Sequence, residues 1–106
     1  MTEFVGYHNG DWKPMSQIGY DPNDLGPSRG DQLVEVVRTF GGKSFRMKDH
    51  IDRMYRSLKY VRIDPGMTAQ EMIDLSEEGI EMNRHLLEES GDFSITQLVT
   101  RGPGGP

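Results

Sequence analysis

The sequence of 106 residues contains no cysteine. It therefore has no disulfide, no thiolate nucleophile and no cysteine-ligated zinc site, and a reducing, cytoplasmic setting is expected. No apolar run approaches the roughly 18 residues of a membrane-spanning helix, and the first ten residues lack the apolar core of a signal peptide. Positive charge is scarce: 12 Lys and Arg residues face 17 Asp and Glu, for a net charge of −5. This acidic balance argues against nucleic acid or an anionic membrane as the main partner.

The composition is that of one small folded domain. Hydrophobic residues make up 34% of the chain and charged residues 27%, proportions typical of a soluble globular protein rather than a disordered one. A domain of this length buries roughly two-thirds of the surface of its unfolded chain, which is sufficient for a single core. Residues 1–106 are therefore predicted to form one small domain, or a piece of a larger one.

Two β-hairpins are predicted in the first half of the chain. In 4–13, apolar and aromatic residues flank Asn9-Gly10, a pair that tolerates the positive φ angles of a two-residue turn. The stretch 33–40 (LVEVVRTF) has the strongest strand pattern, and Gly41-Gly42 connects it to a return strand over 43–47 (KSFRM).

The region between the hairpins and the end of the chain are less regular. Prolines and glycines interrupt 14–32, where we expect only a short strand over 17–20. A last strand is predicted over 93–101, and it runs into a glycine- and proline-rich segment, 102–106. A chain that delivers a strand into such a loop is expected to have been cut within a fold, or just before a second domain. A disordered natural terminus is the alternative.

Two helices are predicted between the hairpins and the last strand. The first covers 49–62, where apolar residues recur with a period of 3.6, and Asp49 is the expected N-cap. The second begins at a capping box formed by Thr68 and Glu71, and Gly91 is placed where a helix-ending glycine belongs. The order of elements predicts an α+β fold with a mostly antiparallel sheet and two helices.

Arg53 is the first candidate for a binding residue. It belongs to a polar stripe on the first predicted helix, with His50, Ser57 and Tyr60 at helical spacing. An arginine offers a rigid fork of donors that suits a phosphate or a carboxylate. The alternatives are a solvated helix face, or an ion pair between Arg53 and a nearby aspartate, Asp49 or Asp52.

Two residues on predicted strands are further candidates for binding residues. Arg101 ends an alternating strand and precedes a glycine-rich loop whose backbone amides could face an anion, although strand-end arginines are also common without a ligand. Glu35 lies within the apolar run of 33–37, where a carboxylate is partly buried and needs a partner. It could pair with a cationic group of a ligand, or face solvent on an edge strand.

Metal and lysine chemistry have no support in the sequence. The three histidines lack metal-ligand spacing, so no metal site is expected. A Schiff-base lysine needs desolvation to lower its pKa, and none of the four lysines lies in an apolar strand.

Four segments together resemble the N-terminal domain of the class IV (fold-type IV) aminotransferases, which are pyridoxal-phosphate enzymes. The segments, in chain order, are YHNGDW at 7–12, DLGPSRGDQLVEVVRTFGGKSF at 24–45, HIDRMYRSL at 50–58 and QLVTRG at 97–102. The family includes branched-chain and D-amino-acid aminotransferases, R-selective amine transaminases and aminodeoxychorismate lyase. The resemblance covers nearly the whole chain. It implies the cofactor pyridoxal 5′-phosphate, an amino acid or amine donor, a 2-oxo acid acceptor and a homodimer.

The resemblance also assigns roles by position. The arginine of the family's His-x-x-Arg motif binds the cofactor phosphate, and here it is Arg53. The strand-end arginine that helps to hold the substrate carboxylate in D-amino-acid aminotransferases corresponds to Arg101. Glu35 matches the glutamate that ends a family strand motif and is expected to line or brace the site.

Departures from the family pattern concern the substrate. Val34 stands where an aromatic residue commonly lines the substrate pocket, and Arg29 stands at an aromatic or apolar position. Leu25 replaces the arginine of an Asp-Arg-Gly motif, and Pro103 replaces a histidine of the D-amino-acid pattern. These differences leave the substrate open.

The family's Schiff-base lysine lies in a C-terminal domain, which the resemblance predicts to be absent from residues 1–106. The chain is thus expected to contribute no catalytic lysine and to be inactive alone as part of an aminotransferase. A lyase of the aminodeoxychorismate type is the nearest variant. The alternative from another class is a stand-alone, non-catalytic module that binds an anion or a protein partner.

Overall fold

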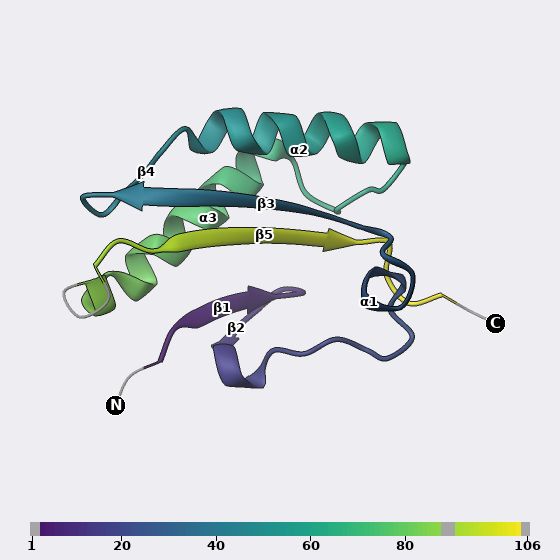
Figure 1. Ribbon diagram of the computed structural model, residues 1–106, viewed down its shortest axis with the longest axis horizontal. Coiled ribbons are helices and arrows are strands. Elements are labelled where there is room, and N and C mark those ends of the chain that lie inside the picture. Colours follow the sequence, from purple (N-terminus) through teal and green to yellow (C-terminus); the bar gives the residue numbers. More distant parts are fainter. Residues whose placement is uncertain (1–2, 88–90, 105–106) are drawn as a thin grey trace.

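A computed structural model describes residues 3–87 and 91–104 of the chain. An N-terminal hairpin comprises β1 (Val5–His8) and β2 (Asp11–Pro14), and a short 3-10 turn and the helix α1 (Leu25–Arg29) lead to the long strand β3 (Gln32–Phe40). The remaining elements are β4 (Lys43–Ser44), α2 (Met47–Val61), α3 (Ala69–Asn83), a second 3-10 turn and β5 (Ser94–Thr100). Figure 1 shows their arrangement.

All strand pairs are antiparallel, as predicted, and they form two separate sheets. β1 pairs with β2, and β3 lies between β4 and β5 in a three-stranded sheet. The β3–β5 ladder is the longest and runs from Gln32 opposite Thr100 to Arg38 opposite Ser94. Two segments far apart in the sequence therefore form the centre of the fold.

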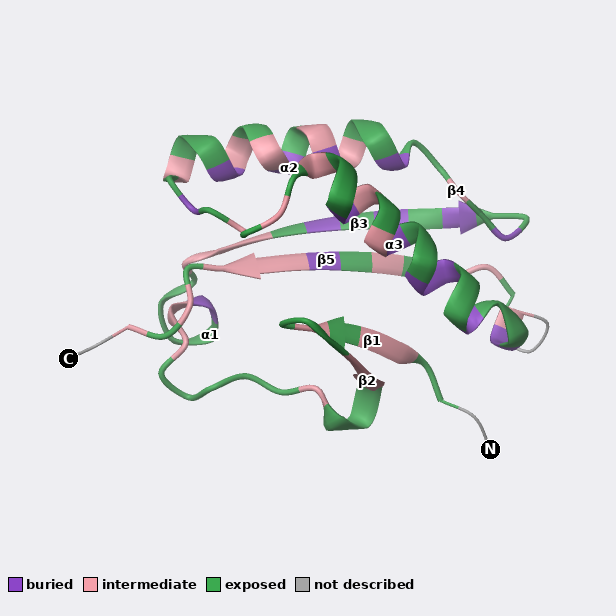
Figure 2. Ribbon diagram, turned by 180° about the vertical axis from the view of Figure 1, so that it is seen from behind, coloured by how far each residue is buried: buried purple, intermediate pink, exposed green. Residues whose placement is uncertain are grey.

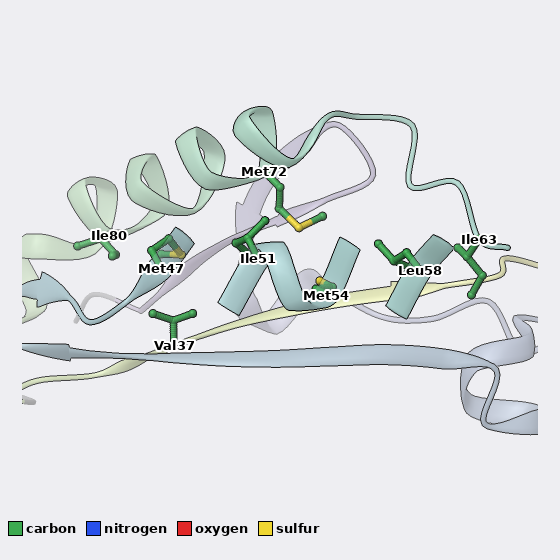
Figure 3. Packing of buried hydrophobic residues seen from close by; sticks show 8 residues of the cluster. All are labelled: Val37, Met47, Ile51, Met54, Leu58, Ile63, Met72 and Ile80. Atoms are coloured by element: carbon green, nitrogen blue, oxygen red, sulfur yellow. The ribbon is translucent and has the colours of Figure 1, made fainter. Parts of the chain in front are cut away.

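Helices α2 and α3 cover one face of the β3–β5 pair. α3 passes behind the two strands in Figure 1 and in front of them in Figure 2, which views the molecule from the opposite side. The core lies between these helices and β3, and it consists of apolar side chains from all three elements and the connection between the helices (Figure 3): Val37, Met47, Ile51, Met54, Leu58, Ile63, Met72 and Ile80. The other face of the sheet has no helix on it among the described residues.

The N-terminal hairpin is attached to α3 rather than to the large sheet. Asn83 at the end of α3 acts like a neighbouring strand: its Oδ1 accepts from the Val5 N–H at 2.7 Å and its Nδ2 donates to the Val5 carbonyl at 2.9 Å. The turn at Asn9-Gly10 has φ angles of 48° and 97°, which confirms the predicted hairpin.

The prediction of two helices is wrong in one respect, because the structure contains a third, α1. Pro27 and Gly26 are among the residues expected to interrupt any long element over 14–32, and α1 has only five residues. Both lie in the first turn of α1, where a proline needs no N–H because the first amides of a helix have no partner within it. The Asp24 side chain caps this turn by accepting from the Gly26 N–H at 2.8 Å.

Three further predictions differ from the structure. The return strand expected over 43–47 stops at Ser44, because Arg46 adopts a left-handed conformation with φ 56° and turns the chain into α2. Arg46, and not Asp49, is therefore the N-cap residue, and Met47 is buried as the first residue of the helix. The short strand expected over 17–20 is absent, since Met15–Gln17 form a 3-10 turn and residues 18–20 are irregular.

The second predicted helix begins as expected. Thr68 Oγ1 accepts from the Glu71 N–H at 3.1 Å, and the Glu71 side chain accepts from the Thr68 N–H at 2.9 Å, which completes the capping box. α3 continues into the 3-10 turn Arg84–Leu86. Gly91, the predicted end of this helix, has φ 70° and donates its N–H to the Leu87 carbonyl at 2.7 Å; residues 88–90 lie outside the described ranges.

Candidate functional site: an arginine and histidine on a helix above a buried glutamate

Strand β3 directs Glu35 toward helix α2. Side chains alternate along a strand, and in β3 the residues Glu35, Val37 and Thr39 are buried while their neighbours are exposed. Glu35 is only 6% exposed, so its carboxylate lies within the layer between sheet and helix. The prediction that Glu35 needs a partner is confirmed, and the alternative that it faces solvent is wrong.

Helix α2 supplies the partners of Glu35. Its apolar stripe, which includes Ile51, Met54 and Leu58, packs into the core. His50 and Arg53 lie three residues apart on the border of that stripe. They are consequently on the same side of the helix and can reach the same group on β3.

Both oxygens of the Glu35 carboxylate are engaged. Arg53 donates from Nε to Oε2 at 3.1 Å and from Nη2 to Oε1 at 2.5 Å. His50 Nδ1 lies 2.7 Å from the same Oε1 and donates to it when the proton is on Nδ1. The predicted alternative of an Arg53 pair with Asp49 or Asp52 does not occur, because Asp49 contacts Arg46 and Asp52 contacts Lys48.

This arrangement fixes the charge states of the pair. The Arg53 guanidinium, which hydrogen-bonds to Glu35, holds the pKa of the carboxyl below its ordinary value, against the opposing effect of burial. The His50 contact lowers this pKa further. The same pair raises the pKa of Arg53. Glu35 is therefore an anion and Arg53 a cation at neutral pH.

Arg53 retains donors for an external anion. Its side chain is 62% exposed although Glu35 is buried, so one edge of the guanidinium faces the sheet and the rest faces solvent. A guanidinium has five N–H donors, and Glu35 occupies the Nε edge. The Nη1 side remains directed away from the carboxylate, and charge-assisted donation to a phosphate suits this group. The donor set therefore fits a phosphate.

The structure places Arg101 at a different point of the fold. At the end of β5, its Nε donates to Asp31 at 2.6 Å, Nη2 donates to the Val61 carbonyl at 2.8 Å, and Nη1 donates to the Arg62 carbonyl at 3.2 Å. These carbonyls belong to the C-terminal end of α2, eight or nine residues beyond Arg53. At 1.5 Å per residue, the two arginines meet α2 at points about 12 Å apart along the helix.

Val34 and Arg29 lie apart from the Glu35–Arg53 pair. Val34 is 49% exposed on the face of the sheet opposite to α2. Arg29 is exposed in the last turn of α1. Of the five residues singled out in the sequence, the structure joins only Glu35 and Arg53 by direct contact.

An apolar surface lies near this pair. The uncovered face of the sheet exposes about half of each of Val34, Val36, Phe40 and Phe45. A shallow groove between β3 and the start of α2 is lined by Val36, Arg38, Phe40, Phe45 and His50. His50 thus contacts Glu35 and also borders the apolar groove.

Neither a buried lysine nor a cluster of metal ligands occurs among the described residues. None of the four lysines is buried, and Lys48 is paired with Asp52, so none has the desolvated setting that activates a lysine. No group of three potential metal ligands occurs among residues 3–87 and 91–104. No helix in those ranges has the length and apolar character needed to cross a bilayer.

Two contacts of the site were not predicted from the sequence. Asp31 was not identified as the partner of Arg101, although extending the β3–β5 register by one pair brings these two opposite charges together. His50 was placed on the stripe with Arg53, but its contact with Glu35 was not foreseen. Such a contact is indicated by an ionisable residue in an apolar strand when the next helix carries cationic groups three residues apart.

The chain is similar in sequence to aminotransferases. It is 36% identical over 98 residues to a protein of Methanocaldococcus jannaschii named "Putative branched-chain-amino-acid aminotransferase", a match covering 92% of this chain and 32% of that protein. It is 32% identical over 76 residues to a D-alanine aminotransferase of Staphylococcus aureus, covering 72% of this chain and 27% of the relative. The chain therefore spans at most about a third of the length of these relatives. No family model matches it.

The fold is also that of known aminotransferases. A fold IV transaminase from Curtobacterium pusillum superposes with a TM-score of 0.79 at 21% identity, covering 90% of this chain and 32% of that chain. A branched-chain amino acid aminotransferase of Escherichia coli superposes with a TM-score of 0.73 at 17% identity, covering 99% of this chain and 34% of that one.

Proposed function

Because the homologues and structural neighbours of this chain are fold-type IV aminotransferases, we propose that it is the N-terminal part of a pyridoxal-phosphate-dependent aminotransferase. The complete enzyme moves an amino group between an amino acid or amine and a 2-oxo acid. The observation that carries the proposal is the exposed guanidinium of Arg53 on α2, which hydrogen-bonds to the buried Glu35 on β3.

In this proposal Arg53 holds the phosphate of pyridoxal 5′-phosphate. Its exposed donors and permanent positive charge support that role. When bound, the cofactor supplies the carbonyl and the electron-withdrawing ring that amino transfer requires. A catalytic lysine comes from outside residues 1–106, since the setting of the four lysines here supports none of them.

The substrate side of the proposal involves Arg101, Val34 and Arg29. Arg101 uses three of its five N–H groups on Asp31 and the end of α2, so two donors remain for a substrate carboxylate. Val34 presents a small apolar side chain where an aromatic one is expected from the family pattern, which favours a wider pocket. Branched-chain and D-amino acids are both compatible with the relatives' names.

We further propose that the complete enzyme is a homodimer. The support is the uncovered apolar face of the sheet, since large apolar patches rimmed by polar residues mark interaction sites. A cytoplasmic location stays a prediction.

Cofactor binding can be tested on the chain itself. Pyridoxamine 5′-phosphate is a suitable probe, because it carries the phosphate but no aldehyde that would react with surface lysines. Titration into 15N-labelled protein should shift the side-chain Nε–H resonance of Arg53 or its backbone neighbours on α2. Arg53→Ala should weaken binding at least about tenfold, the effect of losing a charge-assisted contact.

Two controls make this experiment specific. Arg84→Ala removes another arginine that is paired with a carboxylate, Glu81, on the exposed surface, and it should leave the affinity unchanged. Pyridoxamine without phosphate should produce no shift at Arg53. Equal affinity of Arg53→Ala and the unaltered chain would remove Arg53 from the phosphate-binding role.

The activity needs a separate test. The chain with pyridoxal phosphate, an amino acid and 2-oxoglutarate is expected to produce no glutamate, because none of its four lysines has the setting of a catalytic one. Replacing the corresponding segment of the Methanocaldococcus jannaschii relative by residues 1–106 should give a chimera that turns over. A chimera that folds and binds the cofactor but has no activity with any amino donor would contradict the aminotransferase proposal.

A further inference from the structure

We infer that Glu35 is a positioning residue, which locks the Arg53 guanidinium in the orientation that receives a phosphate. The inference rests on the proposed function and adds a role to it. Glu35 does not contact the anion in this arrangement. It acts through Arg53, by holding the Nε edge of the guanidinium and leaving the Nη1 side for the ligand.

The lock is built from a rigid and a flexible partner. Glu35 is buried on β3 and its backbone belongs to the β3–β5 ladder, opposite Gln97, so its carboxylate has a fixed position. Arg53 is a long side chain on a helix surface, and its side chain is 62% exposed. An exposed arginine without such a partner samples many rotamers and loses that freedom when it binds a ligand.

Two contacts on Arg53 define one orientation. The hydrogen bonds from Nε at 3.1 Å and from Nη2 at 2.5 Å reach different oxygens of the same carboxylate. This parallel geometry fixes the plane of the guanidinium as well as its distance. His50 Nδ1 approaches Oε1 at 2.7 Å and so holds the carboxylate from a second side.

The charge of Glu35 acts in the opposite direction. A carboxylate beside Arg53 reduces the attraction of that site for a phosphate, because it partly neutralises the cation. If Glu35 only competed with the phosphate for Arg53, its removal would strengthen anion binding. If it positions Arg53, its removal weakens binding, because the guanidinium must then be ordered by the ligand itself. The two roles therefore predict effects of opposite sign.

Glu35→Gln and Glu35→Asp separate these roles. The glutamine substitution removes the charge and places an amide donor where Arg53 needs an acceptor. The aspartate substitution keeps the charge but shortens the side chain by one methylene, so it cannot keep both hydrogen bonds without a shift of the helix. We expect both substitutions to weaken the binding of pyridoxamine 5′-phosphate about three- to tenfold, the range for ordering one flexible side chain.

A spectroscopic measurement tests the lock without any ligand. In the unaltered chain, the Arg53 Nε–H proton should exchange with water more slowly than that of Arg56, which is on the same helix and exposed. In Glu35→Gln and Glu35→Asp the Arg53 proton should exchange as fast as the Arg56 proton. This readout is local, so a general loss of stability would not mimic it while the backbone spectrum is retained.

The matched control is Glu81→Gln. Glu81 accepts hydrogen bonds from Nε and Nη2 of Arg84, and the substitution changes the net charge by the same amount, but this pair lies on the exposed surface at the end of α3. Its phosphate-probe affinity should equal that of the unaltered chain.

The outcomes distinguish the two hypotheses. If the unaltered chain does not bind the probe, the cofactor role of Arg53 is refuted and the inference falls with it. If the chain binds but both Glu35 variants bind equally well or more tightly, only the inference is overturned. Fast exchange of the Arg53 Nε–H in the unaltered chain also overturns it, and that result requires no variant to fold.

Discussion

Glu35 on β3 and Gln97 on β5 are direct partners in the antiparallel ladder, and both polar side chains are buried under the helices. Glu35 has two cationic or donor groups from α2 on its carboxylate. The Gln97 amide donates to Ser76 at 3.1 Å, but its Oε1 has no donor among the described residues. A polar pair thus lies within an otherwise apolar layer, and only one of its members is fully satisfied.

We expect Gln97→Leu to raise the free energy of unfolding by up to about 1 kcal/mol. A buried carbonyl oxygen without a donor is destabilising. Its replacement by an apolar group of similar volume removes that penalty, at the loss of the hydrogen bond to Ser76 and of a weak one to Met47 Sδ at 3.7 Å. Urea unfolding followed by circular dichroism measures the change. Gln70→Leu, at an exposed position of α3, is the control and should not stabilise the fold. Destabilisation by Gln97→Leu would show that the amide makes contacts worth more than its unsatisfied oxygen.

Asp92 should be an important residue for the turn between β3 and β4. It accepts the N–H groups of Gly41 and Gly42 at 3.0 and 2.8 Å and the Thr39 hydroxyl at 2.9 Å. These donors, the Gly42 amide first, hold the pKa of Asp92 below its ordinary value. Asp92→Ala should lower the free energy of unfolding by about 2 kcal/mol, because the two glycine amides lose their acceptor, whereas the Thr39 hydroxyl keeps the Phe93 carbonyl at 3.0 Å.

The matched control for Asp92 is Asp74→Ala. Asp74 accepts one exposed hydrogen bond from Gln70 on the same helix, so its loss should change stability by less than about 0.5 kcal/mol. Thermal unfolding of the two variants under identical conditions gives the comparison. Equal effects of the two substitutions would show that the turn does not depend on Asp92.

The ion pair of Glu35 predicts that the difference in stability between the unaltered chain and Glu35→Gln depends on pH. Its native pKa lies below the ordinary value of 4.5, so the stabilisation is complete above that pH and is lost as the pH falls through the lower native pKa. Glu35→Gln should be less stable than the unaltered chain by about 1–2 kcal/mol at pH 7, since the exposed side of Arg53 is screened by water. The difference should narrow below pH 4.5, where a protonated Glu35 resembles glutamine.

Denaturant unfolding of both proteins from pH 7 to pH 3 measures this difference. The difference is informative because it cancels the contributions of other acidic groups with lowered pKa values, such as Asp92 and Glu71. A gap that stayed constant over the whole range would mean that ionisation of Glu35 does not contribute to stability.

Much of the fold followed from local sequence patterns. The long alternating strand that became β3, the capping box at Thr68 and the Asn9-Gly10 turn each depend on residues close together in the chain, and all three are confirmed. The errors lie where the local pattern is ambiguous. The sequence pattern predicts the start of α2 at residue 49, but the helix begins at Met47, because Arg46 takes a left-handed conformation that its side chain does not favour.

The candidate site was only partly predictable for a physical reason. Spacing places Arg53 and His50 on one helix face, and an apolar neighbourhood shows that Glu35 needs a partner. The contact between them depends on how α2 lies over β3, which is decided by core residues such as Ile51 and Val37 rather than by the site residues themselves.

Arg101 should contribute to stability whether or not it binds a substrate. It connects Asp31 and β5 to the last carbonyls of α2, where a cation also interacts favourably with the helix dipole. Arg101→Met should lower the free energy of unfolding by about 1–2 kcal/mol and increase amide exchange in the last turn of α2.

The control for Arg101 is Arg29→Met at the exposed end of α1. It should change the free energy of unfolding by less than about 0.5 kcal/mol, as is usual for surface substitutions, and leave amide exchange in α2 unchanged. Hydrogen exchange read by NMR separates a local effect from a global one. An unchanged last turn in Arg101→Met would leave Arg101 without the structural role and free for a ligand.

The uncovered face of the sheet predicts that the chain associates in solution. Val36 and Phe40 are about half exposed on that same face, and burial of such side chains against another apolar surface is favourable. Sedimentation velocity over a range of concentrations should show a reversible increase in mass. Val36→Lys should abolish it, whereas Tyr60→Lys, at an exposed aromatic residue on α2, should not. A monodisperse monomer at all concentrations would favour the stand-alone module over the proposed part of a larger enzyme, because the apolar face would then not act as an association surface.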